Sequence, residues 1–581
     1  MTESHLSSRL SRRAFVAGAT AAGLAAVAAS TASAAESAAK DGKAASSASS
    51  DGEVSVGAPV AGSPSWAAPS WATKPDPIAD SEIVETIQTE VLVLGAGNAG
   101  CAAACSAVEN GAKVLVCEKT DTVNGRGGVV GACNSRLNES LGCMIEPVAA
   151  QYRWNRTCGN RNNEALVTMW FKNSGPAMNW LLDKADQYGA TYSIYAGYAA
   201  NGIIPEEPDA HMFSAGDFAM PPEAGYFVPT GLLYQSSLDQ GVQYMFEAPA
   251  VQLTQETSGR VTGAIVSTAD GYKKIVASKA TILATGDIAG DKEMMNYYCE
   301  PRMQRLIRSD YYPVGINTGD GQKMGMWAGG VMQDGPLPTA LHPQAYSMFH
   351  GPFMFINKNG KRFFNEANWV QAKSLQMLNQ PDAVAWSIFD ADFGEDTADS
   401  LNYGGGMFWD SMSRTVETPF DPQMVIDVVE GEVKKGEDVL GNATAVTAWK
   451  ADTLEELADK IGLDETAKAN FLAEVKRYNE MCDAGEDTEF EKEAHFLYPI
   501  VKPPFYATMT GPCLLAVVGG LKVNTDLAVI DAEGNPIEGL YAIGNASGDL
   551  YAIDYPINMP GNSNGRCLTW GWLVGKTVAA L

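Results

Sequence analysis

The feature that most constrains the fold of this chain is a glycine-rich turn between an apolar strand and a helix. Residues 89–94 form a short apolar run suited to a buried parallel strand. The run leads into 95–100, which reads Gly-Ala-Gly-Asn-Ala-Gly, and then into 101–110, which has the character of a helix. A second apolar strand follows over 113–117, with Glu118 at its end. Strand, GxGxxG, helix, strand and acid in this order predict an α/β unit that binds an adenine dinucleotide.

Each residue type in this turn has a physical role. Gly95 permits the tight turn, Gly97 lets the backbone approach a pyrophosphate, and Gly100 lets helix and strand pack closely. The helix N-terminus offers N–H groups and a positive dipole end to phosphate, and Glu118 can accept hydrogen bonds from a ribose. The residues that we expect to contact the dinucleotide in this unit are Gly95, Gly97, Asn98, Ala99, Gly100, Glu118 and Lys119.

Composition bounds the rest of the chain. A length of 581 residues predicts two or more structural units, and 46% hydrophobic with 19% charged residues is typical of a globular protein. A formal net charge of −28 disfavours nucleic acid as a partner, although solubility explains it equally well. The ten cysteines form no CxxC pair, so the sequence gives no support for a metal site.

The first residues resemble an export signal. Arg12 and Arg13 are followed by Phe15, an Ala-rich apolar run and a small-residue cleavage site at 32–34, which together resemble a twin-arginine signal peptide over 1–34. The alternative is a disordered N-terminus with a chance pair of arginines. The resemblance implies a protein of the periplasm or the extracytoplasmic face of the cell envelope. Residues 35–84 are rich in Ala, Ser, Gly and Pro, and we expect a linker without packed structure. No later stretch approaches the roughly 18 apolar residues of a membrane span, so we expect no integral membrane segment in the mature chain.

Three further segments resemble FAD-binding flavoproteins and favour FAD over NAD as the dinucleotide. The first is a glycine-rich turn at 125–128, suited to a second approach to the pyrophosphate. The second is a strand that runs into Ala-Thr-Gly over 279–286. The third, at 539–546, is a strand that returns near the C-terminus and should bring Asn545 to the ribityl chain. The cofactor contacts expected here are Gly127, Gly128, Thr285, Gly286, Gly544 and Asn545.

Over about 85–581 the chain resembles the flavoprotein family of fumarate reductase, urocanate reductase and 3-ketosteroid dehydrogenase. Five more segments carry this resemblance: 318–321, 342–343, 357–366, 519–524 and 560–565. The family implies a Rossmann-like FAD-binding domain in two sequence pieces, 85–340 and 510–581, with an inserted α+β capping domain over 341–509. It implies that the cap excludes water from the flavin. It also implies cofactor contacts from Asp320 and from Asn562 and Ser563, which precede an expected helix over 568–580.

The chain departs from fumarate reductases where these bind and protonate a dicarboxylate. Aligned by the landmarks above, their proton-donating Arg falls on Val370, the relay Glu and Arg fall on Tyr346 and Phe349, and the carboxylate-binding His and Arg fall on Ala516 and Asn558. Each lost charge-assisted bond is worth about 1.5–3 kcal/mol. We therefore predict that fumarate is not the substrate.

Four residues are candidates for catalysis. Tyr555 lies in Asp-Tyr-Pro, which resembles the Tyr-Pro-Gly of ketosteroid dehydrogenases, where the hydroxyl polarises a ketone; packing is the alternative role. Tyr346 is a second candidate, more simply structural, and His342 is either a substrate ligand or part of a turn. Arg566 could steady the reduced flavin or reach a substrate carboxylate. The pair of Arg362 and Glu366 is expected to order the cap.

The resemblance predicts an FAD-dependent oxidoreductase acting on CH–CH bonds. The favoured reaction is reduction of an activated C=C bond in a small unsaturated substrate, by hydride from flavin N5 and a proton from the protein. Two alternatives stay open: a desaturase of the ketosteroid dehydrogenase type and a non-catalytic flavin electron carrier; an NAD-dependent dehydrogenase is a more distant one. No haem motif or second nucleotide fingerprint is visible, so we expect a separate electron-donor redox protein in the cell envelope.

Overall fold

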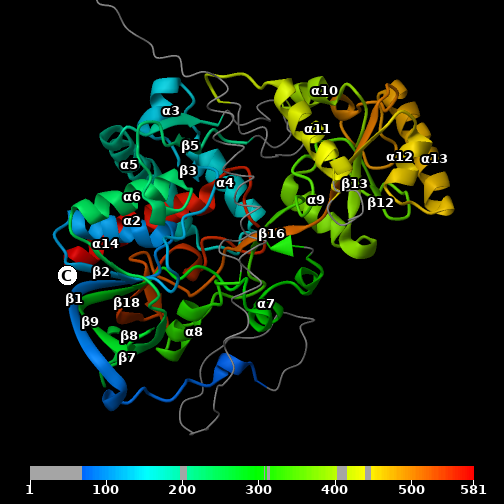
Figure 1. Ribbon diagram of the computed structural model, residues 1–581. Helices are drawn as coiled ribbons and strands as arrows, with labels where there is room; N and C mark the ends of the chain where they lie inside the picture. The colour runs from blue at the N-terminus through cyan, green and yellow to red at the C-terminus, as the bar shows by residue number, and fades with distance from the viewer. Residues whose placement is uncertain are drawn as a thin grey trace, which may run out of the picture.

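The computed structural model describes residues 68–195, 206–306, 308–309, 315–401, 403, 415–438 and 446–581. The expected signal peptide and the first part of the expected linker lie outside these residues. Two lobes are visible in Figure 1, one around a large sheet and one, here called the cap lobe, formed by the chain between residues 343 and 512. No helix in the described ranges combines the length and the apolar character that a membrane crossing requires.

The larger lobe is built on an eight-stranded mixed sheet in the part of the chain described. Five neighbouring strands run parallel, because helices cover the sheet and allow crossover connections. Residues Val91–Leu94 pair with Val114–Cys117 on one side and with Ala280–Leu283 on the other. All four residues from Val91 to Leu94 are buried. In spatial order the strands are β17 (Ala528–Ile530), β18 (Pro536–Ala542), β9 (Gly271–Leu283), β1 (Ile83–Leu94), β2 (Val114–Cys117) and β6 (Gln243–Met245), with β8 (Val261–Thr268) on β9 and β7 (Ala250–Gln255) on β8.

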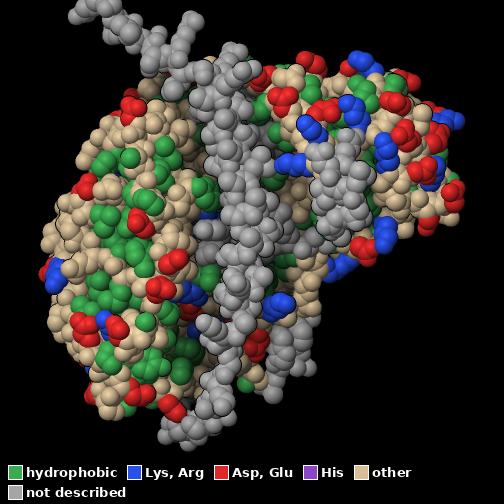
Figure 2. Space-filling view, in the orientation of Figure 1, with side chains coloured by type: hydrophobic (Ala, Val, Ile, Leu, Met, Phe, Trp, Pro, Cys, Tyr) green, Lys and Arg blue, Asp and Glu red, His purple; other side chains and the backbone are tan. Residues whose placement is uncertain are grey.

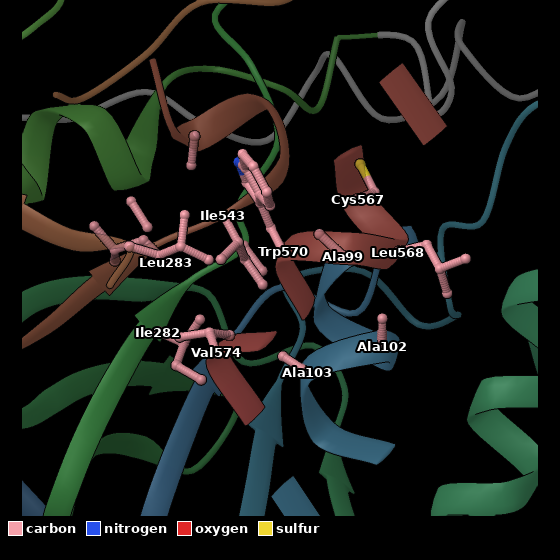
Figure 3. Packing of buried hydrophobic residues seen from close by; sticks show 14 of the residues in the cluster. Ala99, Ala102, Ala103, Ile282, Leu283, Ile543, Cys567, Leu568, Trp570 and Val574 are labelled. Atoms are coloured by element: carbon pink, nitrogen blue, oxygen red, sulfur yellow. The ribbon is translucent and has the colours of Figure 1, made fainter. Parts of the chain in front are cut away.

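Helices cover one face of this sheet, and two of them are in close contact (Figure 1). Helix α14 (Asn562–Ala579) packs on α2 (Asn98–Glu109), where a Cβ atom on Gly571 would lie 2.5 Å from the Cβ of Ala102. Figure 3 shows Ala99, Ala102 and Ala103 of α2 beside α14, whose Trp570 lies near Ile543 and whose Val574 lies near Ile282. This contact fixes the C-terminal helix against the glycine-rich turn. The other elements of the lobe are α3 (Arg136–Leu141), α4 (Pro147–Thr157), α5 (Glu164–Tyr188), α6 (Val228–Asp239), α7 (Lys292–Tyr298), α8 (Asp320–Trp327) and the strands β3 (Val130–Gly131), β4 (Thr191–Ile194) and β5 (Ala210–Ser214).

The cap lobe has its own antiparallel sheet and is joined to the larger lobe by a small three-stranded sheet. Figure 2 shows acidic and basic side chains mixed over its visible face, so that face carries no patch of a single sign. Its strands, in spatial order, are β12 (Met354–Asn357), β13 (Ala385–Phe389), β15 (Phe505–Thr510) and β14 (Ala448–Ala451). Its helices are α9 (Val370–Met377), α10 (Phe393–Ser400), α11 (Pro422–Asp438), α12 (Leu454–Lys460) and α13 (Glu465–Ala484), and the connecting sheet consists of β10 (Arg308–Ser309), β16 (Cys513–Val517) and β11 (Thr339–His342).

The structure confirms the α/β fold and corrects the expected linker. Trp71 is 2% exposed and packs against the rings of Tyr297 and Tyr298, at centroid distances of 5.5 and 5.8 Å. Its backbone carbonyl accepts a hydrogen bond from the indole of Trp327. The end of the expected unstructured segment is therefore part of the core of the larger lobe, because burial of one large aromatic ring outweighs the turn-forming residues around it.

Candidate functional site

The turn between β1 and α2 shows why its glycines are needed. A Cβ atom on Gly100 would overlap the carbonyl oxygen of Gly95, and one on Gly95 would lie 2.5 Å from the carbonyl oxygen of Ala284. At Gly97 the nearest atom to an added Cβ is the carbonyl oxygen of Asn124, at an ordinary distance of 3.6 Å. Protein packing requires glycine at 95 and 100, whereas no protein atom requires it at 97, where the approach of a pyrophosphate to the backbone stays a prediction.

Glu118 directly follows β2, at the end of the strand as the sequence predicts, and its carboxylate is held by the turn. Oε2 accepts a hydrogen bond from the backbone N–H of Ala96 at 2.7 Å. Oε1 accepts from the backbone N–H of Thr120 at 3.0 Å and from the side-chain amide of Asn124 at 3.1 Å. Within the described structure Oε2 accepts one bond, which leaves a lone pair for a ribose hydroxyl.

Lys119 and Asp320, both expected at the cofactor, pair with each other. The ammonium group of Lys119 lies 2.8 Å from Oδ2 of Asp320 and 3.1 Å from the hydroxyl of Thr318. Asp320 is the first residue of α8, so the pair connects the end of β2 to the start of that helix. The contact of either residue with the dinucleotide stays a prediction.

The second glycine-rich turn is tied to the first by Asn98. The side-chain amide of Asn98 donates to the carbonyl of Arg126 at 2.7 Å and to Oδ1 of Asn564 at 2.8 Å, and its Oδ1 accepts from the N–H of Arg126. Gly127, at φ +141°, packs against the side chain of Asn564, and Gly128 follows it. Asn98 therefore joins both turns to α14, and its contact with the dinucleotide stays a prediction.

Several buried polar groups around these turns have no partner in the part of the chain that the structure describes. They include Nη1 of Arg126 and the hydroxyl of Thr285, which precedes Gly286 in the Ala-Thr-Gly turn. A buried guanidinium N–H group and a buried hydroxyl without partners are costly unless a ligand satisfies them. Sequence reasoning missed Arg126, because the pattern directs attention to the glycines on both sides of it. The donors present fit the pyrophosphate of a dinucleotide.

Near the C-terminus, Arg566 holds Asn545. Arg566 is fully buried, and its guanidinium donates to the side-chain oxygen of Asn545 and to the carbonyls of Val518, at 2.9 Å, and Ser547, at 3.3 Å. All these partners are neutral oxygens. A buried cation with neutral partners attracts an anionic group, and the contact of Arg566 with reduced flavin or with a substrate stays a prediction. Gly544, at φ +58°, turns the chain against Ala99 of α2.

Helix α14 begins at Asn562, six residues before the expected start. The hydroxyl of Tyr555 accepts a hydrogen bond from the N–H of Ser563 at 3.0 Å. Burial raises the pKa of Tyr555, which is 8% exposed, so the phenol stays protonated. A hydroxyl that accepts from an N–H group keeps its own proton for donation. Asn562 is fully buried, and its amide nitrogen donates to the carbonyls of Pro556 and Met559.

His342 and Tyr346 lie on the chain that crosses to the cap lobe. His342 ends β11, opposite Cys513 of β16, and its Nδ1 lies 2.9 Å from Oε1 of Gln344. Tyr346 is half-buried against the apolar core of the cap lobe, and burial raises its pKa. The structure thus brings Tyr555, Asn562, Ser563 and Arg566 together at the start of α14 and places His342 and Tyr346 in the crossing segment.

Three of the positions aligned with charged groups of fumarate reductases carry uncharged side chains that are buried in the protein. Phe349 is fully buried in an aromatic cluster of the cap lobe, and Val370, which begins α9, is 1% exposed. Asn558 is 1% exposed, and neither its side-chain oxygen nor its nitrogen has a hydrogen-bond partner on a described residue. Of these three positions, Asn558 alone offers polar atoms to a ligand.

Comparison with known proteins agrees with this geometry. Residues 90–558 match the family described as FAD binding domain. The chain is 27% identical to vinyl phenol reductase of Lactiplantibacillus plantarum, over 84% of this chain and 96% of that protein. It is 25% identical to a probable fumarate reductase of Shewanella frigidimarina, over 84% of this chain and 75% of that protein. A solved 3-ketosteroid dehydrogenase of Rhodococcus jostii shares the fold, with a TM-score of 0.62, 21% identity and coverage of 87% of this chain and 99% of that one. Because the family match spans most of its length, the chain belongs to the FAD binding domain family, and its cofactor is FAD.

Proposed function

We propose that this chain reduces a C=C bond conjugated to a carbonyl group or a phenol ring in an uncharged organic molecule. It is an FAD-dependent oxidoreductase of the class that acts on CH–CH bonds. Bound FAD in its reduced form supplies the two electrons as a hydride. The residues of the chain bind and orient the substrate, exclude water and supply the proton.

The observation that carries the proposal is the state of Asn558. This buried amide offers one acceptor and two donor hydrogens without a partner on the described residues. An amide of this kind suits a hydroxyl or carbonyl group, whereas a dicarboxylate needs cations that Val370 and Ala516 do not provide. The name of vinyl phenol reductase gives an uncharged substrate for that relative, which supports the same substrate class here.

Tyr555 is the proposed acid of the site. Its hydroxyl is fixed by the N–H of Ser563, and its proton passes to the carbonyl oxygen of the substrate as hydride adds to the β carbon. The enol becomes the saturated ketone when a solvent proton binds its α carbon and the O–H proton is released, and Tyr555 regains its proton from solvent. The positive end of the α14 dipole stabilises the negative charge that develops on the carbonyl oxygen. The reverse reaction, desaturation of a ketone, would use the same groups, so the direction depends on the electron donor and on the substrate supplied.

We also propose that the protein is exported and receives electrons from a separate redox protein of the cell envelope. The resemblance of residues 1–34 to a twin-arginine signal supports this location. Rapid reduction of the purified enzyme by NADH alone would contradict a separate donor.

The test of the proposed activity compares two alkenes of similar shape that differ in charge. Benzalacetone presents a neutral ketone, and cinnamate presents a carboxylate on the same styryl group. Reduced methyl viologen serves as the electron source. We expect kcat/KM for benzalacetone or para-vinylphenol to exceed that for cinnamate and fumarate by at least about tenfold. A carboxylate finds no cation at the positions aligned with the fumarate-binding groups, and the absence of one charge-assisted bond costs about that factor. A higher kcat/KM for fumarate would refute the proposal.

A further inference from the structure

Asp209 is a buried carboxyl group that no motif in the sequence marks. It directly precedes β5, is fully buried, and neither of its carboxyl oxygens meets a hydrogen-bond partner on another described residue. Its backbone carbonyl accepts from the N–H of Ala132 at 2.9 Å, so the position of the residue is fixed. A carboxyl group buried in this way is costly unless something outside the described chain satisfies it.

The carboxyl group of Asp209 lies beside the start of α14. A Cβ atom built on Gly131 would lie 2.6 Å from Oδ2 of Asp209 and 2.8 Å from the backbone nitrogen of Asn562. Asn562 is the first residue of α14, and the N–H of the next residue donates to Tyr555. Asp209 and Tyr555 therefore flank the same helix end.

The same segment is joined to the proposed substrate-binding amide. The N–H of Glu207 donates to the carbonyl of Asn558 at 2.8 Å. Asn558 and Asp209 each have two buried side-chain atoms without partners on the described residues. The two segments that carry these unsatisfied groups are thus hydrogen-bonded to each other through their backbones, and buried polar groups without partners are expected at a polar ligand site.

The protonation state of Asp209 decides which ligand atom it can bind. Burial raises the pKa of its carboxyl group well above the ordinary value; its own backbone N–H lowers the pKa in part, and the carboxylate of Glu206 raises it further. A neutral carboxyl group donates its O–H, as Tyr555 does. Two neutral donors and a helix N-terminus favour an oxygen that gains negative charge during the reaction.

We propose that Asp209 is a substrate-binding residue whose carboxyl group hydrogen-bonds the carbonyl or phenol oxygen of the substrate, together with Tyr555. The assignment rests on the proposed function, since it requires a conjugated oxygen in the substrate. A pyrimidine carbonyl of the flavin has the same hydrogen-bonding chemistry, so the test must separate the two oxygens.

The test measures the dissociation constant of benzalacetone from the oxidised holoenzyme by the change in flavin absorbance. We expect Asp209→Ala to weaken binding roughly tenfold or more, because one buried hydrogen bond is lost. Asp209→Asn, which keeps a donor of similar shape, should lose less. Asp217→Ala, an exposed aspartate of the same segment, should bind as the wild type does. FAD content and thermal unfolding of each variant check that the fold is kept.

The flavin midpoint potential, measured on the same variants without ligand, separates the two oxygens. We expect it to be unchanged in Asp209→Asn. A shifted potential with unchanged ligand affinity would assign Asp209 to the flavin and overturn the proposal, as would wild-type affinity in Asp209→Ala. Wild-type enzyme that binds neither benzalacetone nor para-vinylphenol would refute the proposed function itself, and the role of Asp209 with it.

Discussion

The hydroxyl oxygen of Tyr555 lies 3.0 Å from the backbone nitrogen of Ser563 and accepts its N–H at the second residue of α14. This contact fixes a proton-bearing group at the positive end of an 18-residue helix. It also joins the segment before the helix to the helix itself. The chemistry that we propose depends on this pair.

Tyr555→Phe should therefore lower kcat/KM for a neutral alkene by about 10²-fold or more, the usual effect of losing a positioned acid. FAD content should be unchanged, since the ring stays in place. Because burial raises the pKa of Tyr555, the wild-type rate should show no loss from its ionisation up to about pH 10. Steady-state rates of both proteins across the pH range check this, and a variant as active as the wild type would exclude Tyr555 as the acid.

Glu118→Ala should weaken the binding of FAD. The carboxylate orders the turn through the N–H groups of Ala96 and Thr120, and it is the proposed acceptor for the ribose. Losing a charged hydrogen-bond acceptor costs about 1.5–3 kcal/mol, or roughly 10- to 100-fold in affinity. Flavin absorbance after gel filtration measures the loss. Asp121→Ala, an exposed acid in the same loop, is the matched control and should retain FAD.

The ion network of the cap lobe predicts a dependence of stability on pH. Arg362 pairs with Glu366 at 2.7 Å, as the sequence predicts, and with Asp487 at 2.6 Å. All three side chains are buried. Burial opposes the charge of Asp487, but hydrogen bonds from Arg362 and from two backbone N–H groups outweigh it and lower its pKa to about 2. In the unfolded chain Asp487 takes up its proton at higher pH, so its contribution to stability is complete above about pH 4 and is lost as the pH falls to about 2.

The comparison of wild type with Asp487→Asn isolates this contribution. The difference in their free energies of unfolding in urea, followed by tryptophan fluorescence, should be largest near neutral pH and shrink as the pH falls through 4. A difference that does not change with pH would show that Asp487 gains nothing from its charge.

Trp71→Ala should destabilise the larger lobe by about 3–5 kcal/mol, the cost of removing a buried Trp ring. The ring contacts Tyr297 and Tyr298, and its loss should also expose the chain before β1 to protease. Thermal unfolding and limited proteolysis measure the two effects. Trp71→Phe, which keeps an aromatic ring, should lose less; equal losses in both variants would argue against ring packing as the cause.

Local pattern determined what the sequence could predict. The strand, turn and helix around Gly97 are encoded within thirty or so residues, so their positions follow from periodicity and glycine spacing. Asp209 could not be predicted in this way, because the pairing of β5 with β3 brings it to α14 from far along the chain. The neighbours of Trp71 are turn-forming residues, so the sequence predicts a linker there and gives no sign that the ring is buried. The sequence predicts a later start for α14 because Asn562 and Ser563 favour turns unless tertiary contacts hold them in a helix.

The most direct test of the account mixes photoreduced enzyme with one alkene at a time and follows the flavin spectrum in the absence of oxygen. We predict that benzalacetone or para-vinylphenol restores the oxidised spectrum within the turnover time, while fumarate at the same concentration leaves the flavin reduced. Rapid reoxidation by fumarate, with none by the neutral alkenes, would contradict the account.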